Sequence, residues 1–176
     1  MRVWLLVIMT VSLFGGFDAK LTIEKKADQR ARVAVVDGSL PTDVSRKIHA
    51  IFVADLKISG HFLADEAYLS GEYGGNMVDP ALRSQAYVIK YQYTQENGTN
   101  TLLVKVLRAA NSKQIVEGRY AVSNPAKYPF LVHKAVSEIN AQLKFAPIDW
   151  INRYVVFARY TGRKQSEILL LSLIHI

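Results

Sequence analysis

The stretch that decides the fold is Ala86 to Val122, "AYVIKYQYTQENGTNTLLVKVLRAANSKQIVEGRYAV". It holds three runs in which apolar and polar side chains largely alternate, the period of a β-strand with a buried face. Asn97-Gly98 separates the first two runs, and Asn111-Ser112-Lys113 separates the last two; both suit tight hairpin turns. The stretch predicts an antiparallel meander of three strands. Asn97-Gly98-Thr99 has the form of a glycosylation sequon, but a hairpin turn explains it more simply.

Upstream of the meander, the sequence predicts a strand, a helix and a second strand. Val33 to Val36 is an apolar run ended by Asp37-Gly38, as in a strand buried on both faces. Thr42 is a suitable N-cap and Gly60 a suitable helix end. Between them, apolar residues recur at helical spacing: Val44, Ile48, Ile51, Phe52 and Leu56. The apolar stretch His61 to Ala64 follows, and this order favours parallel pairing with a right-handed crossover.

Two further segments complete the predicted fold. Residues 65–85 are rich in glycine and are expected to form a flexible connection, with one helical turn opening at Asp79-Pro80. Its "GEYGG" lacks the lysine and hydroxyl residue of a phosphate-binding loop. Pro129 opens a second amphipathic helix that ends before Pro147. The fold class is therefore α/β: a mixed sheet of about five strands flanked by two amphipathic helices.

The amino-terminus has the layout of a secretory signal peptide over residues 1–19. Arg2 precedes the apolar run "VWLLVIMTVSLF", and small residues follow up to Ala19. The run is too short to span a bilayer comfortably, which takes about 20 residues. A buried strand is the alternative. The 176-residue chain has no cysteine, which excludes cysteine nucleophiles and thiolate metal sites, and its net charge is +7.

The sequence contains no motif for catalysis or for a cofactor. The histidines His49, His61, His133 and His175 do not stand at metal-ligand spacing, and structural roles are expected for them. Asp65-Glu66 are adjacent, which gives no sign that their carboxylates converge. The basic residues lack interleaved aromatic residues, so we expect a solvated basic face rather than a nucleic-acid site. No cofactor, no metal and no nucleic-acid partner are predicted.

Several phrases, taken in order along the chain, resemble the TolB family of the periplasmic Tol–Pal system. The most specific is "VADLKISGHF", Val53 to Phe62, which is similar to the end of a helix in the family's amino-terminal domain. His133 and Ser137-Glu138 stand near similar family positions, and "INRYVVFA", Ile151 to Ala158, resembles the strand that opens the family's propeller. The chain departs from the family at Val36-Asp37, where proline-phenylalanine is frequent.

The resemblance implies an adaptor rather than an enzyme, with an amino-terminal α/β domain over residues 20–150. Residues 151–176 would be the first propeller hairpin, built from Tyr154 to Arg159 and Ser166 to Leu170, plus an unrelated tail, "LLSLIHI". A lone hairpin is marginal in water, so we expect a truncated form that lacks most of the propeller. The alternatives are a genuine terminal strand and a self-contained accessory domain.

The family's partners are TolA in the inner membrane and the lipoprotein Pal at the outer membrane. The resemblance implies that Pal binds only through the missing propeller and that the mature amino-terminus binds TolA by strand addition, without stable membrane insertion after signal cleavage. The partner-binding residues would be Lys20, Leu21, Thr22, Ile23, Glu24, Lys25 and Lys26. The function would be to link TolA to Pal in outer-membrane integrity and cell division. The alternative is a small periplasmic ligand-binding domain or enzyme, with His49, His61 or Asp65 gathered in a pocket.

Overall fold

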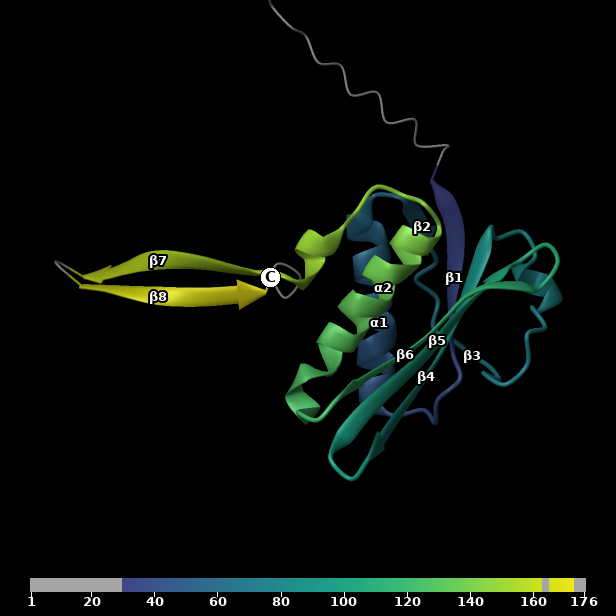
Figure 1. Ribbon diagram of the computed structural model, residues 1–176, viewed down its shortest axis with the longest axis horizontal. Helices are drawn as coiled ribbons and strands as arrows, with labels where there is room; N and C mark the ends of the chain where they lie inside the picture. The colour runs from purple at the N-terminus through teal and green to yellow at the C-terminus, as the bar shows by residue number, and fades with distance from the viewer. Residues whose placement is uncertain (1–29, 163–164, 173–176) are drawn as a thin grey trace, which may run out of the picture.

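The structure is a computed structural model that describes residues 30–162 and 165–172 (Figure 1). The first half contains β1 (Ala31–Asp37), α1 (Asp43–Ser59), β2 (Phe62–Ala64), β3 (Leu69–Ser70) and the 3₁₀ turn η2 (Pro80–Leu82). The second half contains β4 (Tyr87–Glu96), β5 (Thr99–Arg108), β6 (Lys113–Val122), η3 (Pro125–Lys127), α2 (Tyr128–Gln142), η4 (Asp149–Asn152), β7 (Tyr154–Gly162) and β8 (Gln165–Ser172).

Six of these strands form one mixed sheet, in which five follow the order β2-β1-β4-β5-β6 and the sixth, β3, pairs with β1. β1 runs parallel to β2 and β4, and β4, β5 and β6 form the antiparallel meander. The prediction of a mixed sheet with two helices is therefore confirmed. Strands β2 and β3 share one edge of β1. β2 pairs with the amino-terminal half of β1, and β3 pairs with Val36 and Asp37 at its carboxyl end. Two residues are too few to show alternation, so the sequence gives no sign of it.

Local signals set the limits of α1. The Thr42 side chain accepts a hydrogen bond from the Ser45 backbone N–H, and the Ser45 hydroxyl accepts one from the Thr42 N–H. This reciprocal capping satisfies two backbone donors at the start of the helix. Gly60 ends the helix at φ 73°, a left-handed conformation that glycine adopts without the cost of a Cβ.

Both helices cover the same face of the sheet (Figure 1). The core between them is apolar and closely packed, and its fully buried members include Val35, Phe52, Ile89, Leu102 and Val136. Packing of this kind holds α1 and α2 against β1, β4 and β5, because burial of apolar surface is the main force that stabilises a domain.

The opposite face of the sheet is covered by the connection between β2 and β4. Val78 from this connection is 1% exposed and packs with Val36, Val88 and Leu107. The helical turn expected at Asp79-Pro80 is present as η2, with the Asp79 side chain as its cap. The expected flexible connection is instead a segment packed on the sheet.

The predicted carboxyl-terminal hairpin is present as a separate two-stranded sheet, β7-β8 (Figure 1). It projects from the domain beyond η4, and it exposes large apolar side chains, among them Tyr160 at 86% and Ile168 at 78%. Neither strand joins the six-stranded sheet.

Candidate functional site

The residues predicted to bind a partner, Lys20 to Lys26, lie outside the described residues. The predicted signal peptide, residues 1–19, and the last residues of the tail, 173–176, lie outside them too. These assignments stay predictions. What the structure describes is the surface at which the chain enters the domain, from Arg30 onward.

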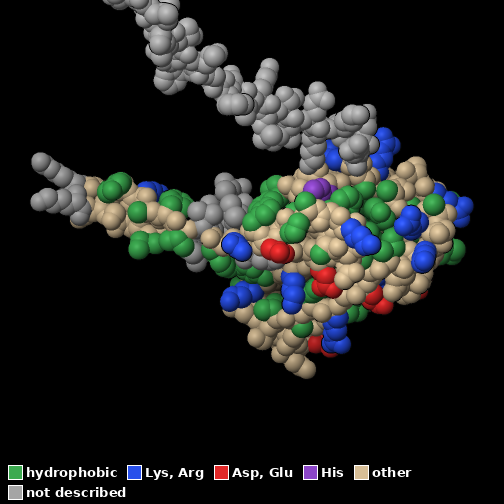
Figure 2. Space-filling model, turned by 45° about the horizontal axis from the view of Figure 1, so that its top comes forward, with side chains coloured by type: hydrophobic (Ala, Val, Ile, Leu, Met, Phe, Trp, Pro, Cys, Tyr) green, Lys and Arg blue, Asp and Glu red, His purple; other side chains and the backbone are tan. Residues whose placement is uncertain are grey.

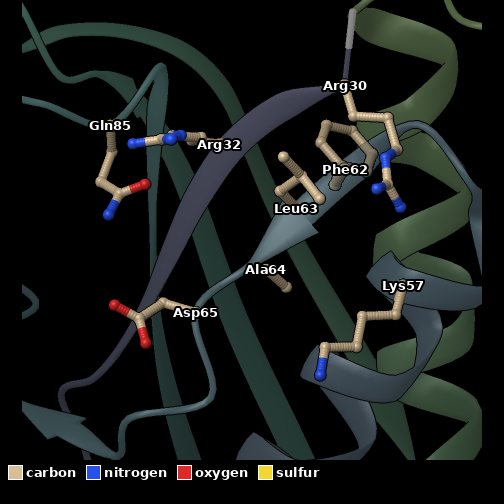
Figure 3. A pocket seen from close by; sticks show the side chains of 8 residues that line it. All are labelled: Arg30, Arg32, Lys57, Phe62, Leu63, Ala64, Asp65 and Gln85. Carbon is tan, nitrogen blue, oxygen red and sulfur yellow. The ribbon is translucent and has the colours of Figure 1, made fainter. Parts of the chain in front are cut away.

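That surface carries a basic pocket at the outer edge of the sheet (Figure 3). The pocket has a volume of about 380 Å³. Its lining residues are Arg30, Arg32, Lys57, Phe62, Leu63, Ala64, Asp65 and Gln85. Figure 3 shows Arg30 and Lys57 on the helix side of β2, and Arg32, Asp65 and Gln85 on its other side. We call Arg30, Arg32 and Lys57, together with β2, the basic edge.

Strand β2 has no partner strand on its outer side among residues 30–162 and 165–172. Toward β1, the Ala31 N–H donates to the His61 carbonyl and the Asp65 N–H donates to the Val33 carbonyl. Because backbone groups alternate in direction along a strand, those of Phe62 and Ala64 point outward. An exposed edge of this kind can pair with an extended segment of another chain.

The charge of the basic edge favours an acidic segment as its occupant. Among the described residues, three cationic side chains lie around β2, and Asp65 is the one carboxylate that lines the pocket. Lys57 also pairs with Glu66, but that pair is solvent-exposed and contributes little to stability. Figure 2 shows Lys and Arg side chains over much of the visible face of the domain, with fewer Asp and Glu side chains among them.

Two residues from the stretches that resemble the TolB family meet in the core. Asp55 Oδ2 on α1 lies 2.7 Å from His133 Nδ1 on α2, and both side chains are fully buried. The sequence places each near a family position but does not predict that they pair. The contact joins α1 to α2, and neither side chain lines the basic pocket.

His49, His61 and Asp65, the residues named for the enzyme alternative, do not gather in one pocket of the described part of the chain. His49 packs edge-on against Tyr68, and His61 stacks on Phe145, each with ring centroids 5.1 Å apart. Asp65 lines the basic pocket without either histidine. Within the described part of the chain, no group of three or more histidine, aspartate or glutamate side chains could hold a metal ion.

A buried polar cluster lies at the carboxyl end of β1. Asp37 accepts hydrogen bonds from the Tyr68 hydroxyl at 2.6 Å and from the Ser39 N–H at 2.8 Å. Burial alone would raise the pKa of Asp37, but these hydrogen bonds outweigh it and hold the pKa below its ordinary value. Burial lowers the pKa of His49, and the charge of Asp37 offsets part of that effect. The cluster holds β1, α1 and the Tyr68 segment together.

Curated relatives resemble the chain over almost all of its length. The Tol-Pal system protein TolB of Wolinella succinogenes is 29% identical over 180 residues, which cover 96% of this chain and 41% of that protein. TolB of Helicobacter hepaticus is 26% identical over 166 residues, covering 94% and 39%. TolB of Campylobacter jejuni is 28% identical over 141 residues, covering 79% and 31%. The chain is TolB-like. It spans about two fifths or less of the length of these relatives.

A solved structure gives the same answer for the fold. The crystal structure of TolB from Acinetobacter baumannii superposes on the TolB-like chain with a TM-score of 0.65, at 15% identity, over 84% of this chain and 37% of that one. No protein-family model matches the sequence. None of the helices within residues 30–162 and 165–172 has the length and apolar character needed to cross a membrane. The family resemblance and the α/β fold inferred from the sequence are thus confirmed.

Proposed function

We propose that this chain acts as a periplasmic adaptor of the Tol–Pal system, and not as an enzyme. In this role it links TolA in the inner membrane to Pal at the outer membrane, in support of outer-membrane integrity and cell division. The observation that carries the proposal is the similarity to Tol-Pal system proteins across 96% of the chain, including the hairpin beyond the α/β domain. Export would depend on residues 1–19, which have the layout of a signal peptide.

We propose that TolA binds the segment Lys20 to Lys26 as an added strand. Leu21 and Ile23 alternate with Thr22 and Glu24, so one face of the segment is apolar and the other polar. In strand addition, backbone hydrogen bonds supply affinity and alternate side chains supply specificity. The basic edge lies where the chain enters the domain, and its charge would attract an acidic partner surface before the strand pairs.

The first test replaces the apolar face of this segment in the full chain and measures its affinity for TolA. We expect Leu21→Ser with Ile23→Ser to weaken binding at least about tenfold, because two buried side chains contribute more than 1.4 kcal/mol. The matched control, Thr22→Ser with Glu24→Gln, changes the other face and should bind with little loss. Equal affinity of both variants, or unchanged affinity after deletion of Lys20 to Lys26, would remove the proposal.

The second test addresses the basic edge. Arg30→Gln with Lys57→Gln should slow TolA association several-fold at low salt and have a smaller effect at high salt, because charges outside the main contact act chiefly on the association rate. Lys47→Gln with Lys134→Gln removes the same charge from exposed positions elsewhere on the two helices. If both double variants slow association equally, net charge explains the effect and the basic edge has no special part.

We propose that residues 30–162 and 165–172 do not bind Pal, because the family's Pal contact lies on a propeller. The described part of the chain holds one isolated hairpin, β7-β8, and no propeller. A pull-down with purified Pal should recover none of the chain above background. Tight retention would show that the α/β domain or the hairpin carries its own Pal contact.

A further inference from the structure

The described sheet has a second unpaired edge, at the opposite end from the basic edge. Strand β6 pairs with β5 on one side, and within residues 30–162 and 165–172 no strand pairs with its other side. An edge strand carries a row of backbone N–H and C=O groups that can bond to another strand. β6 has ten residues and β2 has three, so β6 offers the longer row.

A bulge limits the regular part of β6. Val106 on β5 lies opposite Val116, but the next residue, Leu107, lies opposite Gln114. Ile115 is therefore the extra residue of the bulge. A bulge interrupts the hydrogen-bonded ladder and increases the local twist of the strand. A strand that pairs with the outer side of β6 finds a regular ladder only from Val116 onward.

The regular part of β6 carries one charge of each sign, on either side of a glycine. Glu117 and Arg119 are exposed, with Gly118 between them, and no ion pair of the described residues includes either side chain. Glu117 accepts a hydrogen bond from the Gln114 amide of the same strand. Side chains two positions apart point to the same face of a sheet, so both charges lie on one face.

The neighbouring residues of β6 point to the other face, toward the helices. Tyr120 is 5% exposed, and its hydroxyl donates to Glu138 Oε2 on α2 at 2.9 Å. A Cβ at Gly118 would lie 2.5 Å from the same hydroxyl oxygen, so the Tyr120 side chain covers the glycine. This contact fixes the edge strand on α2 before any partner binds, which lowers the cost of association.

An antiparallel second copy of β6, centred on Gly118, brings the opposite charges together. In this register Glu117 of each copy lies opposite Arg119 of the other, so two pairs form at once. Opposite charges across neighbouring strands stabilise a sheet, and like charges destabilise it. We propose that two copies of this chain associate through β6 in this register and form one continuous sheet.

The charges and the bulge together favour this register over its neighbours. A centre at Glu117 or at Arg119 would place like charges opposite each other. A centre at Ile115 would pair Lys113 with Glu117, but that ladder would cross the bulge. The two-fold arrangement also places residues of the same face opposite each other, so the helices of both copies lie on one side of the joined sheet.

The dimer would be weak and reversible. Val116, which would lie opposite Tyr120 of the other copy, is already 6% exposed, so association buries little new apolar surface. Backbone hydrogen bonds and the two charge pairs would supply most of the affinity. Because β2 and β6 stand at opposite ends of the strand order, the basic edge stays free in both copies. The inference therefore does not depend on the Tol–Pal role proposed above.

The test measures self-association of the full chain by sedimentation velocity at protein concentrations up to about 1 mM, which detects weak dimers. We expect a monomer–dimer equilibrium. Arg119→Glu places a carboxylate opposite Glu117 in both copies and should weaken association at least about tenfold at low salt. Lys113→Glu makes the same change in charge on the same strand, but before the bulge, and should have little effect. Both positions are exposed, so both variants should fold.

An exchange of charges identifies the contact itself. Glu117→Arg combined with Arg119→Glu restores opposite charges in the same register and should recover association. An equimolar mixture of the two single variants, Glu117→Arg and Arg119→Glu, should form mixed dimers more readily than either variant forms its own. If one of these variants does not fold, Arg119→Ala removes both attractive pairs and should still weaken association.

A last variant separates this contact from adhesion of the apolar hairpin. Val156→Asp with Ile168→Asp places charges at exposed positions of β7 and β8, and it should leave the dimer unchanged. The proposal fails if the chain stays monomeric over the whole range of concentration. It also fails if Arg119→Glu associates as well as Lys113→Glu does, or if the hairpin variant alone abolishes association.

Discussion

The buried pair of Asp55 and His133 gives the sharpest test of how the two helices are held together. Both side chains are 0% exposed and the contact is 2.7 Å long. Removing one member of a buried pair costs about 3–5 kcal/mol, because its partner stays buried without its main contact. We expect Asp55→Ala and His133→Ala each to lower the free energy of unfolding by about that amount, a large share of the 5–15 kcal/mol typical of a domain.

The assay is urea unfolding of the full chain, followed by far-ultraviolet circular dichroism, for both single variants and for a double variant. Asp55→Ala with His133→Ala removes both polar groups together, so this double variant should lose clearly less stability than the two single losses added, because neither group is left buried without the other. Lys57→Ala breaks the exposed pair with Glu66 and serves as the control, with an expected loss below about 1 kcal/mol. Single losses no larger than this control, or strict additivity, would refute the reasoning.

Three further predictions concern single positions, each measured by the same unfolding assay. Thr42→Ala removes the side-chain cap of α1 and should lower the free energy of unfolding by about 1 kcal/mol. Thr42→Ser keeps a hydroxyl at the cap and should retain most of the stability of the original chain. Gly98→Ala should lower the free energy of unfolding by about 1–2 kcal/mol, because φ at this position is +76°, a conformation that residues with a Cβ adopt at a cost. The cost would come from the backbone alone, since the added Cβ would meet no atom within 4 Å. An unchanged free energy of unfolding would mean that the turn relaxes. In the folded chain the pKa of His49 lies below its ordinary value of 6.5, because the side chain is buried. As the pH drops below about 6.5, the unfolded chain binds the proton before the folded chain does, so the free energy of unfolding falls. His49→Gln should flatten that fall, and an unchanged slope would exclude His49 as its source.

Features that depend on neighbouring residues could be predicted from the sequence. Asn97 and Gly98 both adopt positive φ, 49° and 76°, as a tight turn between β4 and β5 requires. Thr42 and Gly60 mark the limits of α1 for equally local reasons. The spacing of apolar residues then assigns the buried faces of the meander and of both helices.

Features that depend on distant residues could not be predicted. The pairing of Asp55 with His133 joins positions 78 residues apart, and no local pattern encodes it. The segment over the second face of the sheet is held by hydrogen bonds from Lys90 and Lys105 to backbone carbonyls. Every residue has a backbone carbonyl, so the sequence does not indicate which ones a lysine will contact. The place of β2 at the edge of the described sheet follows from the strand order, which is itself set by long-range pairing.

The central place of β1 has a consequence for the order in which the chain folds. β1, α1 and β2 span residues 31–64, so the pairing of β1 with β2 needs no later part of the chain. The other side of β1 stays unpaired until residues 87–91 of β4 arrive. Through that interval the run Val33 to Val36, buried in the final fold, has its backbone free to pair with another copy. We expect early intermediates of this chain to be the species most prone to aggregation, and holding factors that bind nascent chains to act at this stage.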